Sequence, residues 1–245
     1  MKAIIIAAGS GTRLNNFIPK PLIKINGKTI LERQVELFKK NKINEIVVIT
    51  GSDDHKFTLK NIKYVKDDLH MEHDILYSFM AAKNDMNDDI FVSYSDILID
   101  ETILKEVISS DHDISIAVDQ NWERHYEGRT DHPKSEAENV LIRKNKILTI
   151  RKNISKTYPN DEIYEFLGIM KMSKFGCSLF LKKFEQLEKY HKGTFHTAPS
   201  LLKAYLTDMI QELIDSDVDV SYIPITGNWC EIDTQQDIDI AKSVF

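Results

Sequence analysis

The sequence predicts an α/β fold with a doubly wound, mainly parallel sheet. Short continuous apolar runs, typical of strands buried on both faces, recur through the first half of the chain. Segments between them space their apolar residues as amphipathic helices do. This alternation favours parallel strands joined by helical crossovers. The 245 residues permit one large α/β domain or two small ones, and we expect a single domain over residues 1–245.

The elements of the first half follow from these patterns in order. Strands are expected at 2–8, 45–50, 62–65, 90–95 and 114–118, with helices at 29–41, 73–83 and 100–109. Thr29 is a suitable N-cap for the first helix. In parallel sheets ligands bind at the carboxyl ends of the strands. We therefore expect the loop after residue 8, the turn at Gly51 and Asp96 to line one crevice.

The middle of the chain has a different character. Residues 120–138 are polar, aromatic and rich in charge, residues 139–151 predict a hairpin turning near Lys144-Asn145, and residues 163–172 predict a strand. We expect residues 120–172 to form an antiparallel lid inserted on the sheet. The remaining expected elements are helices at 173–190, 200–214 and 235–244 and strands at 218–224 and 229–232.

Composition excludes several classes of protein. A formal net charge of -6 argues against a nucleic-acid-binding surface. Cys177 and Cys230 lie far apart, form neither a disulfide framework nor a zinc-ligand spacing, and suit a reducing compartment. The N-terminal apolar run is too short for a signal peptide, and no stretch has the length of a membrane-spanning helix. We expect a cytoplasmic protein that binds neither nucleic acid nor membrane.

The most informative segment follows the first expected strand. Residues 7–14 read Ala-Ala-Gly-Ser-Gly-Thr-Arg-Leu, and Lys20 stands between two prolines shortly afterwards. Small residues let backbone N–H groups approach a ligand closely, and the two cations indicate that this ligand is an anion such as a nucleoside triphosphate. The residues expected to contact the nucleotide here are Ala7, Ala8, Gly9, Ser10, Gly11 and Thr12.

Other phosphate motifs fit this segment less well. The Lys-Ser/Thr pair of the P-loop is missing, and Leu14 stands where a dinucleotide fingerprint requires its third glycine. Arg13 and Lys20 suit a triphosphate, because they would neutralise the α-phosphate and the departing pyrophosphate. The alternative is a glycine turn with two solvated cations.

Residues 7–14 together with Pro19-Lys20-Pro21 resemble the signature of the nucleotidyltransferases that make nucleotide sugars and CDP-alcohols. The resemblance extends over most of the chain and implies a Rossmann-like fold. Asp96 matches the first metal-binding aspartate of that family and Asp233 the second, although Asp233 is also placed to cap a helix. The resemblance implies a Mg²⁺-dependent attack by a phosphate or phosphonate oxygen on the α-phosphorus of the nucleotide, with Arg13 and Lys20 as catalytic cations.

The chemistry of these residue types agrees with that implication. Mg²⁺ prefers a few carboxylates together with water and substrate phosphates, and two aspartates at strand ends supply the carboxylates. The nucleophile is already an anion, so that positioning and charge neutralisation replace a strong general base. Gly51, at a strand end, and Asp74 and Ser78, in a stretch similar to the family's, are further nucleotide-binding candidates, with a plain amphipathic helix as the alternative for the last two.

Residues 119–140 resemble the substrate lid of phosphocholine and phosphonate cytidylyltransferases. Arg129 or Lys152 would hold the phosphate or phosphonate, and Trp122 would face a quaternary ammonium. A primary amine would instead pair with a carboxylate. Trp229, beside the second metal-binding aspartate, resembles a further part of this pattern and is a candidate substrate-binding residue. The carboxylate candidates are Glu136, Glu138 and Glu165. The alternative is a solvated charged loop, and we interpret His125 and His132 as surface residues.

These features predict a CTP-dependent cytidylyltransferase acting on a small phosphonate or phosphate alcohol or amine. The candidate acceptors are 2-aminoethylphosphonate, a hydroxyalkylphosphonate and phosphocholine. The alternatives are a sugar-1-phosphate nucleotidylyltransferase and a nucleotide-sensing regulatory subunit. Retention of Arg13, Lys20, Asp96 and Asp233 argues against the regulatory subunit. The sequence leaves a homodimer open.

Overall fold

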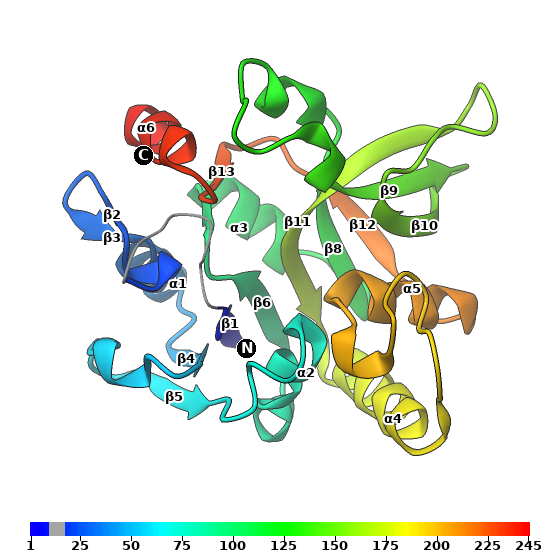
Figure 1. The fold of residues 1–245 in the computed structure, drawn as a ribbon, viewed down its shortest axis with the longest axis horizontal. Helices are drawn as coiled ribbons and strands as arrows, with labels where there is room; N and C mark the ends of the chain where they lie inside the picture. The colour runs from blue at the N-terminus through cyan, green and yellow to red at the C-terminus, as the bar shows by residue number, and fades with distance from the viewer. Residues whose placement is uncertain (10–17) are drawn as a thin grey trace.

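The computed structural model describes residues 1–9 and 18–245 and places most strands in one twisted sheet (Figure 1). Its order is β10-β9-β11-β6-β1-β4-β5, with β8 paired to β11 and β12 paired to β8. The strands of this sheet are β1 (Lys2–Ala7), β4 (Glu45–Thr50), β5 (Lys63–Lys66), β6 (Ile90–Tyr94), β8 (Ile114–Asp119), β9 (Glu138–Arg143), β10 (Lys146–Lys152), β11 (Glu162–Met172) and β12 (Ser221–Pro224). The helices are α1 (Ile30–Lys40), α2 (Ile75–Met80), α3 (Glu101–Ile108), α4 (Lys174–Tyr190), α5 (Leu206–Asp215) and α6 (Gln235–Val244).

The N-terminal half of the sheet is parallel. Strands β5, β4, β1 and β6 pair in parallel register, as the alternation of apolar runs and amphipathic segments predicted. Their carboxyl ends, near Ala7, Thr50 and Tyr94, therefore lie along one edge of the sheet. The predicted α/β class is confirmed, and none of the helices among residues 1–9 and 18–245 is long and apolar enough to cross a membrane.

Strand β11 joins this parallel half to the rest of the sheet. Its C-terminal part pairs antiparallel with β6 and its N-terminal part with β9, while β8 runs antiparallel along its other side. The last expected strand of the lid is therefore a central strand of the main sheet, and the β9–β10 hairpin continues that sheet outward. Lys144 and Asn145 at the hairpin tip both have positive φ, in agreement with the predicted turn.

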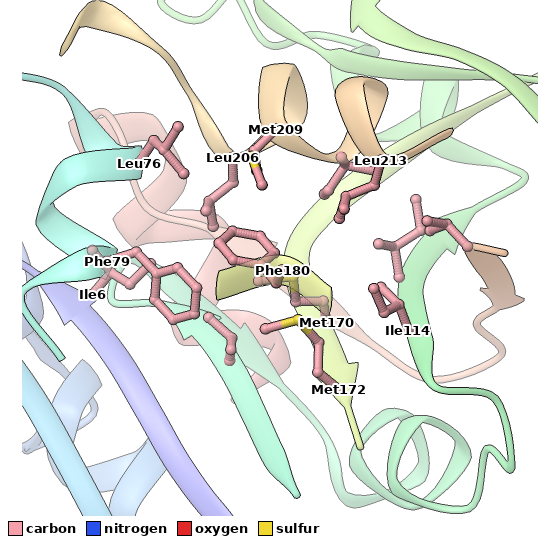
Figure 2. Close-up of a cluster of buried hydrophobic side chains, with 14 of the residues drawn as sticks. Ile6, Leu76, Phe79, Ile114, Met170, Met172, Phe180, Leu206, Met209 and Leu213 are labelled. Atoms are coloured by element: carbon pink, nitrogen blue, oxygen red, sulfur yellow. The ribbon is translucent and has the colours of Figure 1, made fainter. Parts of the chain in front are cut away.

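Helices cover both faces of the sheet, because alternate residues of each strand point to opposite sides. Ile4 and Ile6 of β1 belong to one buried cluster with side chains of α2, α4 and α5. Figure 2 shows Ile6 in this cluster with Phe79 of α2, Phe180 of α4 and Leu206 of α5. Ala3 and Ile5 pack on the opposite face with α1 and α3. The β1, β4 and β6 strands are therefore packed on both faces, and their carboxyl ends lie at the candidate site.

Local capping sets the helix starts. Thr29 accepts a hydrogen bond from the Glu32 amide while the Glu32 carboxylate accepts from the Thr29 amide, which completes the capping box ahead of α1. The helix predicted over 200–214 was wrong in extent: a 3-10 turn at Leu201–Lys203 precedes α5. The Asp208 carboxylate accepts from the Tyr205 amide and from Thr197, and this arrangement starts the α-helix at Leu206.

Candidate active site

Two short strands that the sequence did not predict as a pair bring two distant aspartates together. Strand β7 (Ile97–Ile99) follows Asp96 and pairs antiparallel with β13 (Trp229–Glu231), which precedes Asp233. The Ile232 amide donates to the Asp96 carbonyl at 2.9 Å and closes this small sheet next to the carboxylates. The pairing therefore places Asp96 and Asp233 next to each other at the carboxyl end of β6.

Lys20 lies between these two aspartates. It begins a 3-10 turn after Pro19, and its Nζ is 3.0 Å from Asp96 Oδ2 and also forms an ion pair with Asp233 Oδ1. Burial alone would lower the pKa of Lys20, but the two carboxylates outweigh it and hold that pKa well above its ordinary value. The point between Asp96 and Asp233 thus attracts a cation strongly.

His132 is a member of the site that the sequence interpretation placed on the surface, and that interpretation was wrong. The side chain is only 4% exposed, and its Nδ1 lies 2.8 Å from Asp233 Oδ2. Burial alone would raise the pKa of Asp233. The hydrogen bond from His132 and the charge of Lys20 outweigh burial, so the pKa is lowered and the carboxyl group is ionised. Nothing in the composition of the charged segment around His132 distinguishes a docked histidine from a solvated one.

Two cavities meet at Lys20 and Asp96. The larger has a volume of about 390 Å³ and extends toward the lid, and the smaller has a volume of about 280 Å³ and extends toward α2. Both are lined by Gly9, Tyr94 and the two charged residues. A ligand with two parts can therefore occupy both cavities with its central part at the cation site.

The smaller cavity contains several of the predicted nucleotide-binding residues. Its lining includes Ala8, Gly9, Asp74 and Ser78. Ala7 is buried at the end of β1, and Gly51 lies behind Ala8, where a Cβ on Gly51 would come within 2.7 Å of the Ala8 carbonyl oxygen. Gly51 thus permits the close approach of two strand ends rather than lining the cavity. Ser10, Gly11, Thr12 and Arg13 lie outside the described residues.

A buried polar network supports this smaller cavity. Ser78 Oγ donates to Asp67 Oδ2 at 2.7 Å, and His73 Nε2 lies 3.1 Å from Asp67 Oδ1. His73, His70 and Ser78 line the cavity, and Asp67 fixes two of them from behind. The sequence interpretation missed Asp67 and His73, which follow β5 at another strand end of the same sheet edge.

Acidic residues outnumber basic ones in the lining of the larger cavity. Glu136, Glu138 and Glu165 line it as predicted, together with Glu231, which the sequence interpretation missed. Glu231 and Asp233 are two residues apart across the end of β13, and this spacing was a signal available in the sequence. His132, Glu231 and Asp233 also offer ligand atoms that all lie within 4.8 Å of one another.

Three carboxyl groups of this cavity, those of Glu138, Glu165 and Glu231, have raised pKa values in the free protein. Burial, together with repulsion from Glu231, raises the pKa of Glu138 to about 7. The pKa of Glu165 is raised well above its usual range, first by burial and also by the nearby Glu231 charge. The pKa of Glu231 is raised by burial and by Asp233 and Asp96. Each of the three would be stabilised in its ionised form by an added positive charge.

Of three other residues predicted to bind the substrate, two line the larger cavity and one does not. Lys152 and Trp229 line the larger cavity, with Lys152 Nζ 2.7 Å from Glu136 Oε2 and the Trp229 indole donating to Asp119 at 3.0 Å. Trp122 does not line it: this indole is buried, donates to the Ile163 carbonyl and has Lys134 over its ring.

Arg129 does not line the larger cavity either. Its Nε lies 2.6 Å from Asp237 Oδ1, and a second nitrogen lies 3.4 Å from Glu231 Oε2. The guanidinium of Arg129 is therefore committed to protein carboxylates and connects the lid to the start of α6. The alternative of a solvated charged loop does not hold for this side chain, which is only 5% exposed.

Gly168 shapes the wall of the larger cavity at a bulge in β11. Its φ is +67°, and a Cβ at this position would lie 2.3 Å from the Tyr94 ring. Gly168→Ala is expected to lower the free energy of unfolding by about 2–4 kcal/mol, because it adds a left-handed backbone cost to a clash. Gly193→Ala is the matched control, since Gly193 also has a positive φ of +88° but open space around it. Urea unfolding of both variants checks this, and equal losses would contradict the clash.

Comparisons with known proteins found a matching family model and several similar proteins. A family model described as the MobA-like NTP transferase domain matches residues 3–214. The CTP:phosphoglutamine cytidylyltransferase of Campylobacter jejuni is 28% identical over 255 residues, with 98% of each chain covered. The choline-phosphate cytidylyltransferase of Streptococcus pneumoniae is 37% identical over 93 residues, which cover 35% of this chain and 41% of that protein. The inositol-1-phosphate CTP transferase of T. maritima shares the fold, with a TM-score of 0.75, 21% identity, and coverage of 99% of this chain and 95% of that one.

Proposed function

Because this chain belongs to the family of MobA-like NTP transferase domains, we propose that it is a Mg²⁺-dependent cytidylyltransferase that transfers CMP from CTP to a small phosphate or phosphonate. The observation that carries the proposal is Lys20 held between Asp96 and Asp233 where the two cavities meet. The nucleotide would occupy the smaller cavity and the acceptor the larger one. CTP is favoured because both curated relatives described above are named as cytidylyltransferases.

The described residues support an in-line displacement. Lys20 would neutralise charge on the triphosphate while an acceptor oxygen attacks the α-phosphorus and the bond to the departing pyrophosphate breaks. Asp96 and Asp233 would hold Mg²⁺, which when bound supplies charge neutralisation and a template for both anions. These two residues suit such an ion, because one carboxylate oxygen of each aspartate already points at the positively charged Lys20 Nζ.

The larger cavity favours an acceptor with a positive charge at the end remote from its phosphate. Six carboxylates line it, but only Lys20, Lys152 and His132 supply basic groups among the described lining residues. Lys20 and Lys152 are already paired with carboxylates. An ammonium group would stabilise the ionised forms of the remaining carboxylates, whose pKa values are raised by burial and mutual repulsion. 2-Aminoethylphosphonate and phosphocholine carry such a group.

A pyrophosphate-release assay tests the proposed function. CTP, UTP, GTP and dTTP are each combined with 2-aminoethylphosphonate, a hydroxyalkylphosphonate, phosphocholine and glucose 1-phosphate in the presence of Mg²⁺. We expect turnover with CTP and an ammonium-bearing acceptor, and loss of turnover with excess EDTA. Turnover of glucose 1-phosphate with UTP or dTTP would establish a sugar-1-phosphate nucleotidylyltransferase instead. No turnover with CTP and any small acceptor would refute the proposal.

A further inference from the structure

One short segment of the lid is attached to the chain around Asp233 at several points. We define the docking segment as residues 128–132 and its receptor as residues 231–237. Gln236 Nε2 donates to the Gly128 carbonyl at 2.7 Å, and the Thr130 amide donates to Gln236 Oε1 at 3.0 Å. In Figure 1 the lid, in green, lies beside α6, in red. More than 100 positions separate the paired residues along the sequence, so these contacts are part of the tertiary fold.

Two residues of the docking segment act on Asp233 from different sides. Arg129 Nε lies 2.6 Å from Asp237 Oδ1, and Asp237 Oδ2 accepts from the Asp233 amide at 3.0 Å. Arg129 therefore fixes the main chain at Asp233 through Asp237. His132 Nδ1 lies 2.8 Å from Asp233 Oδ2 and fixes the side chain directly.

The ring of His132 is itself held in place. It is 4% exposed, and its Nε2 lies 3.7 Å from Glu231 Oε2. Its ring centroid lies 6.1 Å from that of Tyr126. A hydrogen bond to a carboxylate requires a proton on the nitrogen, so Nδ1–H donates to Asp233. The other oxygen, Oδ1, remains directed at Lys20.

We infer that His132 is a positioning residue that orients the Asp233 carboxylate toward the metal ion, and that docking of residues 128–132 completes the metal site. This inference rests on the proposed role of Asp233 as a Mg²⁺ ligand. Partners that orient metal ligands commonly contribute about 10–100-fold in metal affinity or activity. His132 and Asp233 both line the larger cavity, so this segment of the lid contributes to the acceptor cavity as well as to the metal site.

Three substitutions separate orientation of Asp233 from simple packing. In His132→Asn the amide nitrogen falls near the position of Nδ1 and keeps the hydrogen bond to Asp233. In His132→Gln the amide nitrogen falls near Nε2, so the contact with Glu231 is kept and the hydrogen bond to Asp233 is lost. His132→Ala removes both. A packing role predicts losses in thermal stability that follow the volume removed, with metal affinity unchanged.

The readout is Mn²⁺ binding, measured by electron paramagnetic resonance with CTP present and no acceptor, so that it does not depend on turnover. We expect an affinity within about 3-fold of the unmodified protein for His132→Asn, and about 10–100-fold weaker for His132→Gln and His132→Ala. Asp233→Asn is the reference for loss of the metal ligand. If Asp233→Asn weakens Mn²⁺ binding and His132→Ala does not, the positioning role is refuted while the proposed function stands. If Asp233→Asn has no effect on Mn²⁺ binding, both the positioning role and the proposed metal site are refuted.

Discussion

Asp233→Asn is expected to lower kcat for pyrophosphate release by about 10²–10³-fold at saturating CTP and Mg²⁺. The substitution removes one of the two carboxylates that converge on Lys20 and would hold the metal ion. A bound metal contributes several kcal/mol of charge stabilisation in such displacements, and each ~1.4 kcal/mol corresponds to about tenfold in rate. Steady-state assays over a range of Mg²⁺ concentrations measure the loss and show whether added metal restores part of it.

The fold of this variant is expected to survive. Asparagine has nearly the same shape and keeps one of the two oxygens, which can accept from either His132 or Lys20. Its neutrality relieves the repulsion that raises the pKa of Glu231. Asp239→Asn is the control, because Asp239 is exposed on α6, where its Oδ1 lies 3.1 Å from Lys242 Nζ at the surface. Urea unfolding of both variants should give midpoints close to that of the parent protein. Mg²⁺-dependent turnover by Asp233→Asn within tenfold of the parent would remove Asp233 from the site.

The sequence predicts the parallel half of the fold well, because its strands are buried on both faces. The run at Glu45–Thr50 shows this pattern, and the structure places it as a strand of that half of the sheet. The pairing of β7 with β13 was not predictable in the same way. Each strand has only three residues, too few for a period, and their partners are more than 120 positions apart. The juxtaposition of Asp96 and Asp233 came instead from the motif resemblance.

In the lid, the types of residue do not determine which side chains face the cavity and which are paired with other parts of the chain. Arg129 and Trp122 were interpreted from their chemistry and from the resemblance of the lid, as a phosphate ligand and a cation–π partner, and His132 was interpreted as a surface residue. The structure places Arg129 on Asp237, Trp122 in a packed cluster and His132 on Asp233. The sequence of a charged segment is the same whether its side chains face water or form ion pairs with carboxylates elsewhere in the chain. Only the tertiary fold brings residues 128–132 and 231–237 together and decides between those two states.

Glu165→Gln is expected to raise the KM for an ammonium-bearing acceptor by about 10–100-fold, because a hydrogen bond to a charged group contributes about 1.5–3 kcal/mol. The Tyr126 hydroxyl donates a hydrogen bond to Glu165 Oε1, whereas Oε2 is buried without a hydrogen-bond partner among the described residues. This oxygen belongs to a side chain that is 4% exposed and lines the larger cavity. An incoming ammonium would supply the missing donor.

The pH dependence of acceptor binding provides an independent test of the same carboxyl cluster. The pKa of Glu138 is raised to about 7, so this group is largely neutral below that value and ionised above it. Only the ionised form pairs with an ammonium. The KM for 2-aminoethylphosphonate should therefore fall as the pH rises through about 7, whereas the KM for a hydroxyalkylphosphonate should not improve in this way. In Glu138→Gln the fall should be reduced for the amine.

Comparison of charged and neutral acceptors decides whether Glu165 recognises an ammonium. Glu165→Gln should leave the KM for a hydroxyalkylphosphonate within about 3-fold of the parent value, since a hydroxyl can donate to either a carboxylate or an amide oxygen. Glu123→Gln is the matched control, because Glu123 lies in the lid with a side chain that is 67% exposed and pairs with Lys134. Equal effects of Glu165→Gln on the two acceptors would mean that Glu165 shapes the cavity without reading charge. The carboxylates of the larger cavity would then act in metal binding and in contacts with the lid, and not in recognition of the acceptor.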